Sequence, residues 1–457
     1  MKKYTIALIA SAAALCGMAQ NTQSGYFVED YNYRFLMNPA MAPGNKLFVG
    51  FPALCDLNVG LRGNLGLTDV LYNVDGKTTT FLNPGVSASE VMGNLSNMNR
   101  VGVDTRINLL GFGFKMLGGY STINISTRAN VNMRLPKSIF SFLKEGVSNQ
   151  TYEIDGLKAR ALGFAEISFG HSRNITKEWR VGANVKLLAG IGSLSADLDR
   201  ASLVLDRNSW NIITNATVHT SMKGMYYTTS YSDETKRDYV DGLDGDFKPI
   251  SGYGLALDLG AVYKPKALPD WEFSAAVLDL GFISWSNDLV ATTNGDKKFE
   301  SNAFVFSPDE NADNSFSDEW DRMRNSIESL YQLDDAGDKG GRSQMLDATF
   351  NVGAKYTLPM YKRVAFGLLN TTRIAGDFSW TDFRLSANYN PVRNISLAIN
   401  GSAGNLGCGF GWMANLRIPK VGLQFTLAQD NTFFKMAKQG VPTSSNASLT
   451  FGMNFVY

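Results

Sequence analysis

Hydrophobic and polar residues alternate one by one along many stretches of this chain, which is the pattern of β-strands with one apolar face. In residues 119–134, polar side chains occupy the even positions from Thr122 to Arg134, and mainly apolar or small side chains occupy the odd ones. Residues 448–457 alternate in the same way, with Leu449, Phe451, Met453, Phe455 and Tyr457 on one face. The pattern predicts an all-β protein.

Strand patterns recur along most of the sequence. The predicted strands are 46–62, 100–116, 119–134, 157–173, 178–191, 195–206, 209–222, 250–264, 271–285, 343–358, 362–374, 377–390, 394–404, 405–417, 420–430 and 445–457. This makes 16 strands, or 14 if residues 195–222 form an extracellular hairpin. Both numbers are even, as a barrel requires if its first and last strands meet at the same membrane face.

The connections between the predicted strands differ in length in a regular way. Tight turns are marked by Pro265, Pro359, Pro391 and Pro419, and longer connections lie at 63–99, 135–156, 223–249, 286–342 and 431–444. Short periplasmic turns that alternate with long outer loops are typical of a transmembrane antiparallel β-barrel. The sequence therefore predicts such a barrel at residues 46–457.

Tryptophans lie near the ends of several predicted strands. Trp179 and Trp271 begin strands directly after short turns, and Trp285 and Trp380 lie near the long-loop ends. Barrels carry aromatic girdles at both membrane interfaces. We therefore expect these four side chains at the two girdles.

The first 19 residues have the pattern of a secretory signal peptide, with a basic start, an apolar run from Thr5 to Leu15 and small residues up to Ala19. No later stretch approaches 18 consecutive apolar residues, which excludes helical membrane spans. The last strand, ending on Tyr457, resembles the closing strand of Gram-negative outer-membrane barrels, which assembly machinery recognises. We expect Sec export, cleavage after Ala19 and a Gram-negative outer-membrane location, with lipid and the barrel assembly machinery as partners.

Residues 20–45 show no strand alternation and are predicted to plug or cap the barrel from the periplasmic side. The segment is aromatic and contains Asn38-Pro39-Ala40 just before the first strand. Pro52 lies inside that strand, where its missing N–H predicts a bulge or kink.

Several stretches resemble a known family. Asn38-Pro39-Ala40 resembles the amino-terminal segment of FadL-type outer-membrane channels for hydrophobic compounds and of the related PorV-like barrels tied to type IX secretion. The resemblance is greater to a Bacteroidota outer-membrane family of unknown function, and it is carried by Asn38-Pro39-Ala40 with residues 49–52, by 254–260 and by 277–285. It implies a FadL-like barrel of 14 strands and supplies no substrate.

Charged residues lie on the polar faces of the predicted strands, which face the lumen if the apolar faces contact lipid. These residues are Asp104, Arg106, Arg128, Glu166, Lys186, Asp258, Asp279, Lys355 and Arg384. Asp258 and Asp279 belong to two Leu-Asp-Leu-Gly copies on neighbouring strands and need nearby cations, since an unpaired buried charge is costly. The set is either a constriction that selects what passes or a salt-bridged filling that conducts nothing.

The long connections offer further candidates. Residues 286–342 hold 13 acidic and 6 basic residues, a net charge of −7, and residues 317–331 have the pattern of an amphipathic helix that acts as a lid, a docking helix or a local fold. Asp238, Asp241, Asp244 and Asp246 form either a Ca²⁺ site or a solvated acidic loop. Cys55 and Cys408 either pair across the closed barrel or remain free thiols.

No pattern of residues predicts an enzyme, a cofactor or a metal centre. The two histidines, His171 and His219, lie on different strands, and no catalytic or metal-binding motif accompanies them. A net charge of +1 gives no bulk field for nucleic acid. We expect either a gated channel for small hydrophobic or amphipathic compounds, or a non-transporting scaffold or secretion accessory that docks partners through its long loops.

Overall fold

Fourteen antiparallel strands form a closed β-barrel, which confirms the predicted fold class. The computed structural model describes residues 22–145, 150–205, 209–232, 237–293, 297–302, 332–431 and 446–457. The first strand position holds β1 (Leu47–Gly50) and β2 (Asp56–Gly63), and the others are β5 (Met98–Met116), β6 (Gly119–Pro136), β8 (Leu157–Asn174), β9 (Trp179–Leu205), β13 (Gly252–Tyr263), β14 (Trp271–Trp285), β19 (Ala348–Thr357), β20 (Val364–Ile374), β21 (Trp380–Val392), β22 (Ile395–Gly404), β23 (Gly407–Ile418), β24 (Leu423–Gln429) and β25 (Ala447–Val456).

The barrel closes between its last and first strands. β25 pairs antiparallel with β1, where Phe48 faces Val456, and with β2, where Leu57 faces Phe451. This pairing leaves no free edge in the barrel wall, as a sheet surrounded by lipid requires.

The two predicted strands at residues 195–222 rise above the barrel. The lower part of β9 pairs with β13, while its upper part pairs with β10 (Ser209–Ser221). The 14-strand alternative is therefore correct, because this hairpin extends the wall upward and adds nothing to its circumference.

Further short strands enlarge this raised part. They are β7 (Gln150–Glu153), β15 (Leu289–Thr292), β16 (Lys297–Asn302), β17 (Asp334–Asp338) and β18 (Arg342–Met345), with the separate hairpins β11 (Met225–Ser232)–β12 (Arg237–Gly245) and β3 (Leu71–Val74)–β4 (Lys77–Thr80). The helices α2 (Leu67–Val70), α3 (Ala88–Asn94) and α4 (Lys137–Glu145) share a small apolar cluster around Val91. The predicted helix at 317–331 lies outside the described residues.

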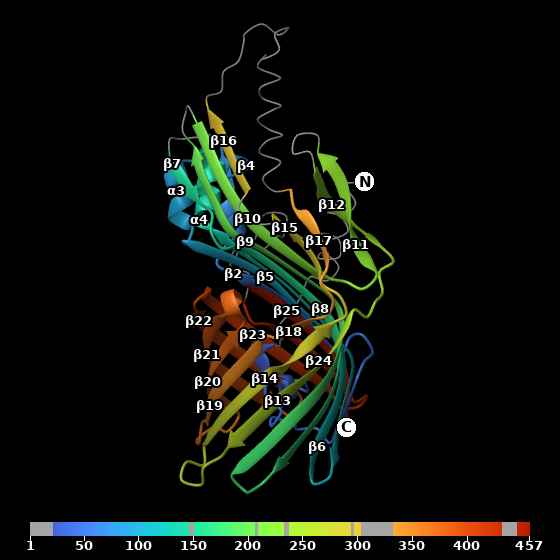
Figure 1. Cartoon of the computed structure of the whole chain (residues 1–457). Helices are drawn as coiled ribbons and strands as arrows, with labels where there is room; N and C mark the ends of the chain where they lie inside the picture. The colour runs from blue at the N-terminus through green and yellow to red at the C-terminus, as the bar shows by residue number, and fades with distance from the viewer. Residues whose placement is uncertain are drawn as a thin grey trace.

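The outer rim of the barrel has unequal heights (Figure 1). β9, β10 and β16 rise far above the barrel on one side, whereas β20–β21 and β22–β23 are joined on the other side by short connections at 375–379 and 405–406. Gly376 lies in the first connection and Gly407 directly follows the second, at φ values of 60° and 111° that favour glycine. Some outer connections are therefore short turns, and long loops occur only at the others.

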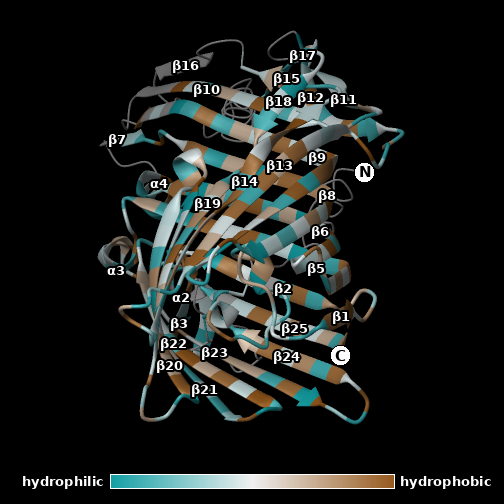
Figure 2. Ribbon diagram, turned by 90° about the horizontal axis from the view of Figure 1, so that it is seen from below, coloured by the Kyte–Doolittle hydropathy of each residue, from teal (hydrophilic) through white to brown (hydrophobic). Residues whose placement is uncertain are grey.

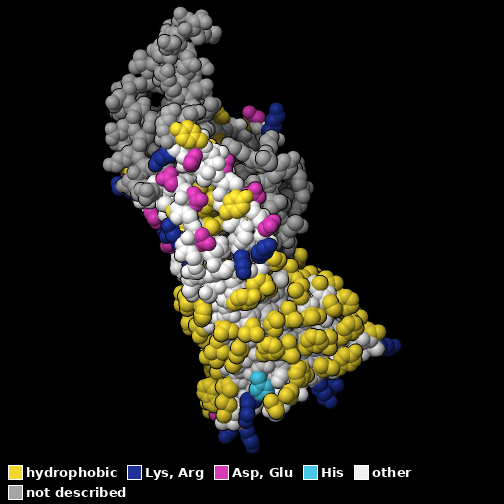
Figure 3. Space-filling view, turned by 45° about the vertical axis from the view of Figure 1, so that its right-hand side comes forward, with side chains coloured by type: hydrophobic (Ala, Val, Ile, Leu, Met, Phe, Trp, Pro, Cys, Tyr) yellow, Lys and Arg dark blue, Asp and Glu magenta, His cyan; other side chains and the backbone are white. Residues whose placement is uncertain are grey.

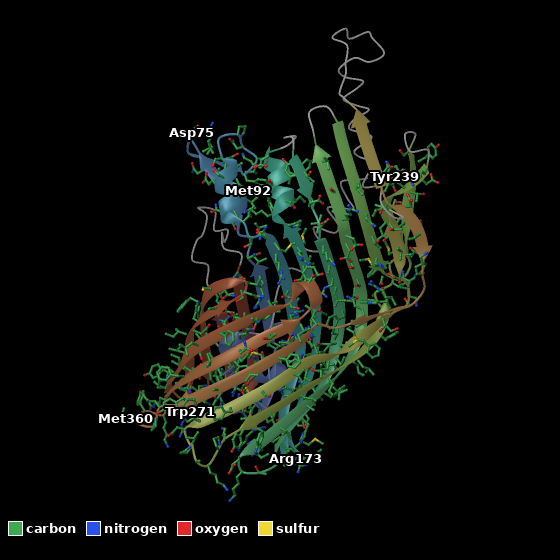
Figure 4. All side chains as sticks on the ribbon, turned by 60° about the vertical axis from the view of Figure 1, so that its left-hand side comes forward. Asp75, Met92, Arg173, Tyr239, Trp271 and Met360 are labelled. Carbon is green, nitrogen blue, oxygen red and sulfur yellow. The ribbon has the colours of Figure 1, made fainter. Side chains whose placement is uncertain are left out.

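Apolar side chains cover the outside of the lower barrel. Apolar and polar residues alternate along the strands in Figure 2, and the apolar set forms a continuous belt in Figure 3. Figure 4 places Arg173, Trp271 and Met360 at the periplasmic end, and Asp75, Met92 and Tyr239 at the outer end. No helix in the described part of the chain is long and apolar enough to span a membrane.

Only two of the four tryptophans occupy the expected girdle. At the periplasmic end Trp179 stacks on Tyr263 and Trp271 packs on Tyr356, with ring centroids 4.5 and 5.1 Å apart. Trp285 and Trp380 point into the lumen and are 1% and 5% exposed, so their expected girdle position is wrong.

The inward direction of these two side chains has a local cause. Trp380 and Arg384 lie four residues apart on the same, inward-facing side of β21. On β14 a bulge opposite Leu257–Leu259 puts both Leu278 and Asp279 inside, which reverses the phase up to Trp285.

Cys55 and Cys408, both free thiols, provide a test of the barrel's orientation. Cys408 is exposed at the outer end of β23, whereas Cys55 is buried in the wall. We expect a membrane-impermeant maleimide to label Cys408 on intact cells and to reach Cys55 only after denaturation. Labelling should therefore vanish in C408S and persist in C55S, and the reverse result would contradict this orientation.

Candidate functional site in the barrel lumen

The amino-terminal segment, residues 22–45, fills the lower lumen and is called here the N-terminal plug. It includes the short 3₁₀ turns η1 (Gln23–Gly25) and η2 (Arg34–Leu36). Its aromatic residues form a buried cluster with wall residues such as Phe48 and Met413. The plug thus provides the apolar part of an interior that the strands line mainly with polar side chains.

Hydrogen bonds hold the plug to the wall near β25. The backbone N–H groups of Gln23 and Ser24 donate to the Asp430 carboxylate over 2.9 and 2.6 Å. Tyr31 and Tyr33 donate their hydroxyls to Asp56 and Asn454 over 2.9 and 3.0 Å. The plug is therefore a specifically docked element.

Asn38-Pro39-Ala40 contacts β9, β13 and β14. The Asn38 amide donates to the carbonyl oxygens of Ala261 and Ala275, both over 3.3 Å, and its Oδ1 accepts the Ala40 N–H over 3.0 Å. A Cβ on Gly260 would lie 2.1 Å from Asn38 Oδ1, and one on Gly182 would lie 2.3 Å from the Pro39 oxygen. The motif therefore packs directly against the wall at two positions where only glycine leaves enough space.

Pro52 lies in a break of the first barrel strand. Residues 51–56 stand opposite only residues 452 and 453 of β25. The break remains bonded on both sides, because Phe51 N–H donates to Met453 O and Ala53 N–H donates to Leu109 O, both over 3.0 Å.

The Tyr33 ring fills the space behind this break. A Cβ on Gly50 or Gly111 would lie 2.7 or 2.5 Å from the Tyr33 hydroxyl. The wall is therefore closed here from within by a plug side chain.

Six of the predicted lumen charges form one buried network above the plug. Lys186 Nζ lies 2.7 Å from both Asp258 Oδ1 and Asp279 Oδ1. Arg128 donates to both oxygens of Asp279 over 2.8 and 2.9 Å. Glu166 lies 3.4 Å from Arg106 and Arg128. The network spans β5, β6, β8, β9, β13 and β14, and it places one cation between the two carboxylates of the Leu-Asp-Leu-Gly copies.

Asp279 is also the strained residue of this network. Its φ is 60°, a conformation that costs a non-glycine residue about 1 kcal/mol. Its N–H donates to Asp258 Oδ1 over 2.7 Å, so the bulge joins the two aspartates directly.

The remaining predicted charges lie elsewhere in the lumen. Asp104 pairs across the lumen with Arg373 over 3.3 Å. Lys355 pairs with Glu29 of the plug, and Arg384 pairs with Asp382 over 3.2 Å. The nine residues therefore form one central network and three separate pairs.

Sequence reasoning missed a second set of cross-lumen charges near the outer end. Asp347 accepts from Arg160 over 2.6 Å and from Arg373 over 3.0 Å, which joins β8 to the β19–β20 side. The alternation of β20 could have identified Arg373, since Leu369, Thr371 and Arg373 share the buried face. Asp347 precedes β19 and has no such signal.

Three cavities lie one above the other between the outer rim and the plug. The outer cavity, about 20 Å³, is lined by residues that include Arg62, Trp380, Leu406 and Cys408. The middle cavity, also about 20 Å³, shares Arg62, Trp380 and Leu406 with it. The inner cavity, about 40 Å³, shares Asp104 and Arg373 with the middle one and reaches the plug at Gln23 and Met37. Side-chain pairs therefore separate neighbouring cavities.

Other candidate groups do not assemble into a site. His171 contacts Ser121, and His219 contacts Asp288 over 2.9 Å on another strand. Asp241 accepts from Thr228 and Ser230. Within the described ranges, no three His, Cys, Asp or Glu side chains come together as metal ligands.

A family of unknown function (DUF5723) matches residues 39–430. The chain belongs to this family. No curated protein matches it. The relation to type IX secretion stays a prediction.

Similar solved structures include two toluene transporters and a FadL homologue. The toluene transporter TbuX of Ralstonia pickettii has 10% identity, 94% coverage of both chains and a TM-score of 0.41. The toluene transporter TodX of P. putida has 10% identity, 93% coverage of this chain and 92% of the other, and a TM-score of 0.39. A Pseudomonas aeruginosa FadL homologue has 9% identity, 96% and 98% coverage and a TM-score of 0.37.

The central network predicts a large effect of Lys186→Met. The variant removes the cation that lies between the buried carboxylates of Asp258 and Asp279. We therefore expect the unfolding free energy to fall by about 3–5 kcal/mol. Urea unfolding in detergent micelles measures this loss. The exposed control Lys266→Met should change it by less than about 1 kcal/mol, and K186M/D258N should recover part of the stability. Equal stability of K186M and the wild type would contradict the network.

The Glu29–Lys355 pair predicts a pH-dependent contribution to stability. Glu29 lies in the plug at the periplasmic end, and the Lys355 ammonium, 2.5 Å away, lowers the pKa of the Glu29 carboxyl from 4.5 to about 2. Because this pKa is lowered by folding, the pair stabilises fully above pH 4.5 and loses its effect as the pH falls towards 2. We expect the difference in urea midpoint between the wild type and E29Q to shrink over this interval. A difference that is constant from pH 7 to pH 2 would exclude this role.

Proposed function

We propose that this outer-membrane barrel is a gated conduit for small amphipathic compounds, and that the conformation described here is closed. The stack of three cavities carries the proposal. It leads from the outer ends of β21–β23 to the plug, and the cavities are separated by side chains instead of backbone. Side chains change rotamer on a time scale that suits a gate.

Three closures lie along this route. Arg62 stacks over Trp380 between the outer and middle cavities, 3.8 Å from the ring centroid. The Asp104–Arg373 pair separates the middle cavity from the inner one. The plug closes the route below, so passage requires the rearrangement of both side-chain pairs and a movement of the plug.

The lining supports amphipathic rather than wholly apolar cargo. The inner cavity contains Thr105, Asn130, Asn351 and Thr371 besides its charges. The buried Oδ1 of Asn130 has no hydrogen-bond partner in the described structure, and a wholly apolar solute would leave it unpaired at a cost of about 1–3 kcal/mol. Within the described residues, the cavities form no continuous apolar groove.

The break at Phe51–Cys55 is the proposed exit into the membrane. Withdrawal of Tyr33 would leave Gly50 and Gly111, which have no side chains, and the small thiol of Cys55 at the break. Its backbone bonds to Met453 and Leu109 are the last barrier, so movement of the plug and opening of the wall are coupled at this point.

The raised wall favours a second candidate function. β9, β10, β11, β12 and β16 extend well beyond the apolar belt, and the three cavities do not involve them (Figures 1 and 3). A surface of this kind suits a scaffold or secretion accessory that docks a partner outside the membrane.

Single-channel conductance in planar bilayers tests the conduit. We expect no conductance from the wild type, little from a variant that lacks residues 20–45, and clear conductance when this deletion is combined with D104N and R373Q. The matched control combines the deletion with D270N and R363Q, a charge-neutral pair of substitutions at the periplasmic turns. Slow migration before boiling on a gel verifies that each barrel is folded.

If every folded variant stays silent, the conduit is wrong and the docking function is favoured. If the variant that lacks only the plug conducts fully, the plug is the gate and the two side-chain pairs do not block the route.

A further inference from the structure

Two roomy cavities lie at the periplasmic end of the barrel, between the plug and the turns of the wall. Their volumes are about 330 and 540 Å³, whereas each of the three cavities higher in the lumen measures about 40 Å³ or less. They meet at residues 42–44 of the plug and at Asn174 and Arg180 of the wall, and the joint space is called here the periplasmic mouth. One water needs roughly 10–15 Å³ by this measure, so the mouth has room for a solute.

Arg180 is a wall residue that borders both cavities of the mouth. It shares the inward face of β9 with Gly182, which packs against Pro39 of the plug. Its guanidinium has one described acceptor, the Ser172 hydroxyl, over 3.0 Å, and its buried Nε has no hydrogen-bond partner in the described structure. A guanidinium has five N–H donors, so most donors of Arg180 remain unused.

Arg34 borders the smaller cavity from the side of the plug. Its Nε donates to the Tyr26 oxygen over 3.0 Å, and its Nη2 lies 3.5 Å from Met41 Sδ. These contacts fix the guanidinium, and no described hydrogen bond uses its Nη1 group. Within the described ranges, neither Arg34 nor Arg180 lies within 4.0 Å of a carboxylate oxygen.

The carboxylates of the mouth are already paired with lysines. These pairs are Glu29–Lys355, Glu178–Lys266 and Glu272–Lys264, with N–O distances of 2.5, 3.4 and 2.7 Å. At longer range Glu272 also attracts Arg34 and Arg180, but the two arginines repel each other. Lysine therefore neutralises each carboxylate, and the charges of both arginines remain in excess.

Further cations without a described carboxylate partner line the mouth. They are Lys115, Arg173 and Lys177. The larger cavity has no acidic residue among those that line it. Lysine and arginine side chains also project from this end of the barrel in Figure 3. The mouth is therefore a positively charged space in which an anion is favoured.

A phosphate group suits this arrangement better than a carboxylate. A phosphate monoester carries close to two negative charges near pH 7, and its three free oxygens point in different directions. Guanidinium groups on two sides of the mouth can each donate to such a group, and phosphate is a preferred partner of arginine. Because Arg180 lies on the inward face of the wall, the site opens to the periplasm and favours a soluble compound.

We propose that the periplasmic mouth binds a phosphate group, held by Arg34 of the plug and Arg180 of the wall, with Lys115, Arg173 and Lys177 adding attraction. The site lies apart from the three lumen cavities and goes beyond the proposed conduit, since binding requires no passage. One of its two main contacts comes from the plug, so the ligand binds while the plug is seated. Binding therefore stabilises the seated plug.

Calorimetric titration of the refolded wild type in maltoside detergent tests the site with glycerol 3-phosphate, and with glycerol as the uncharged analogue. We expect binding of glycerol 3-phosphate and none of glycerol. R34Q and R180Q should each weaken binding about tenfold or more, the effect of losing one charge-assisted contact. Lys362→Gln makes the same charge change on a periplasmic turn outside the mouth and should leave the affinity unchanged.

A second titration, with dihexanoyl phosphatidylglycerol, identifies the source of the phosphate. Tighter binding of this lipid, still weakened in R180Q, assigns the site to a lipid headgroup. Tighter binding of glycerol 3-phosphate assigns it to a soluble periplasmic compound.

R180Q is the decisive variant, because R34Q also removes a bond within the plug. An unchanged affinity in R180Q, or an equal loss in K362Q, overturns the site. The barrel that lacks residues 20–45 should not bind, and undiminished binding there overturns the contribution of the plug. Phosphate binding in a barrel whose variants never conduct leaves the site and removes the conduit, and conductance without phosphate binding does the reverse.

Discussion

The absence of water inside a lipid bilayer is the constraint on which the rest of this structure depends. Every backbone N–H and C=O in the membrane must find a partner within the protein, so the sheet has to close on itself. The closure lies between β25 and the first strand position, where the chain also carries its one large irregularity. The break at Phe51–Cys55 is tolerated there because its N–H and C=O groups remain bonded to β5 and β25.

Closure then determines the chemistry of the interior. Since lipid takes the apolar face of each strand, the polar face must be satisfied inside, and each buried charge needs an opposite charge. Lys186 meets this need for Asp258 and Asp279, and Arg373 meets it for Asp104 and Asp347. The plug supplies what the strands lack, namely large aromatic side chains that occupy volume and polar groups that complete hydrogen bonds with Asp430, Asp56 and Asn454.

The sequence predicted the barrel because alternation is a local property that each strand displays by itself. The inward direction of the nine charges follows from the same alternation. The alternation also predicts that Asp258 and Asp279 lie on neighbouring strands and need a cation between them. The partners did not follow, because Arg373 and Asp104 are far apart in sequence and meet only across the closed lumen. A single bulge at Asp279 also exchanges the inward and outward faces of β14. The sequence does not indicate this bulge, because the residue with the left-handed backbone conformation is not a glycine.

The unequal outer rim gives the barrel a front and a back. A cylinder with loops of equal length would present the same surface to every neighbour in the membrane plane, whereas this one has a low side at β20–β23 and a tall side at β9–β10. The outer cavity lies on the low side, among residues of β21–β23 and β2. In the proposed conduit, a solute that diffuses along the membrane surface approaches the outer cavity from this low side, and the angle at which the barrel is turned about the membrane normal decides which neighbours share that access.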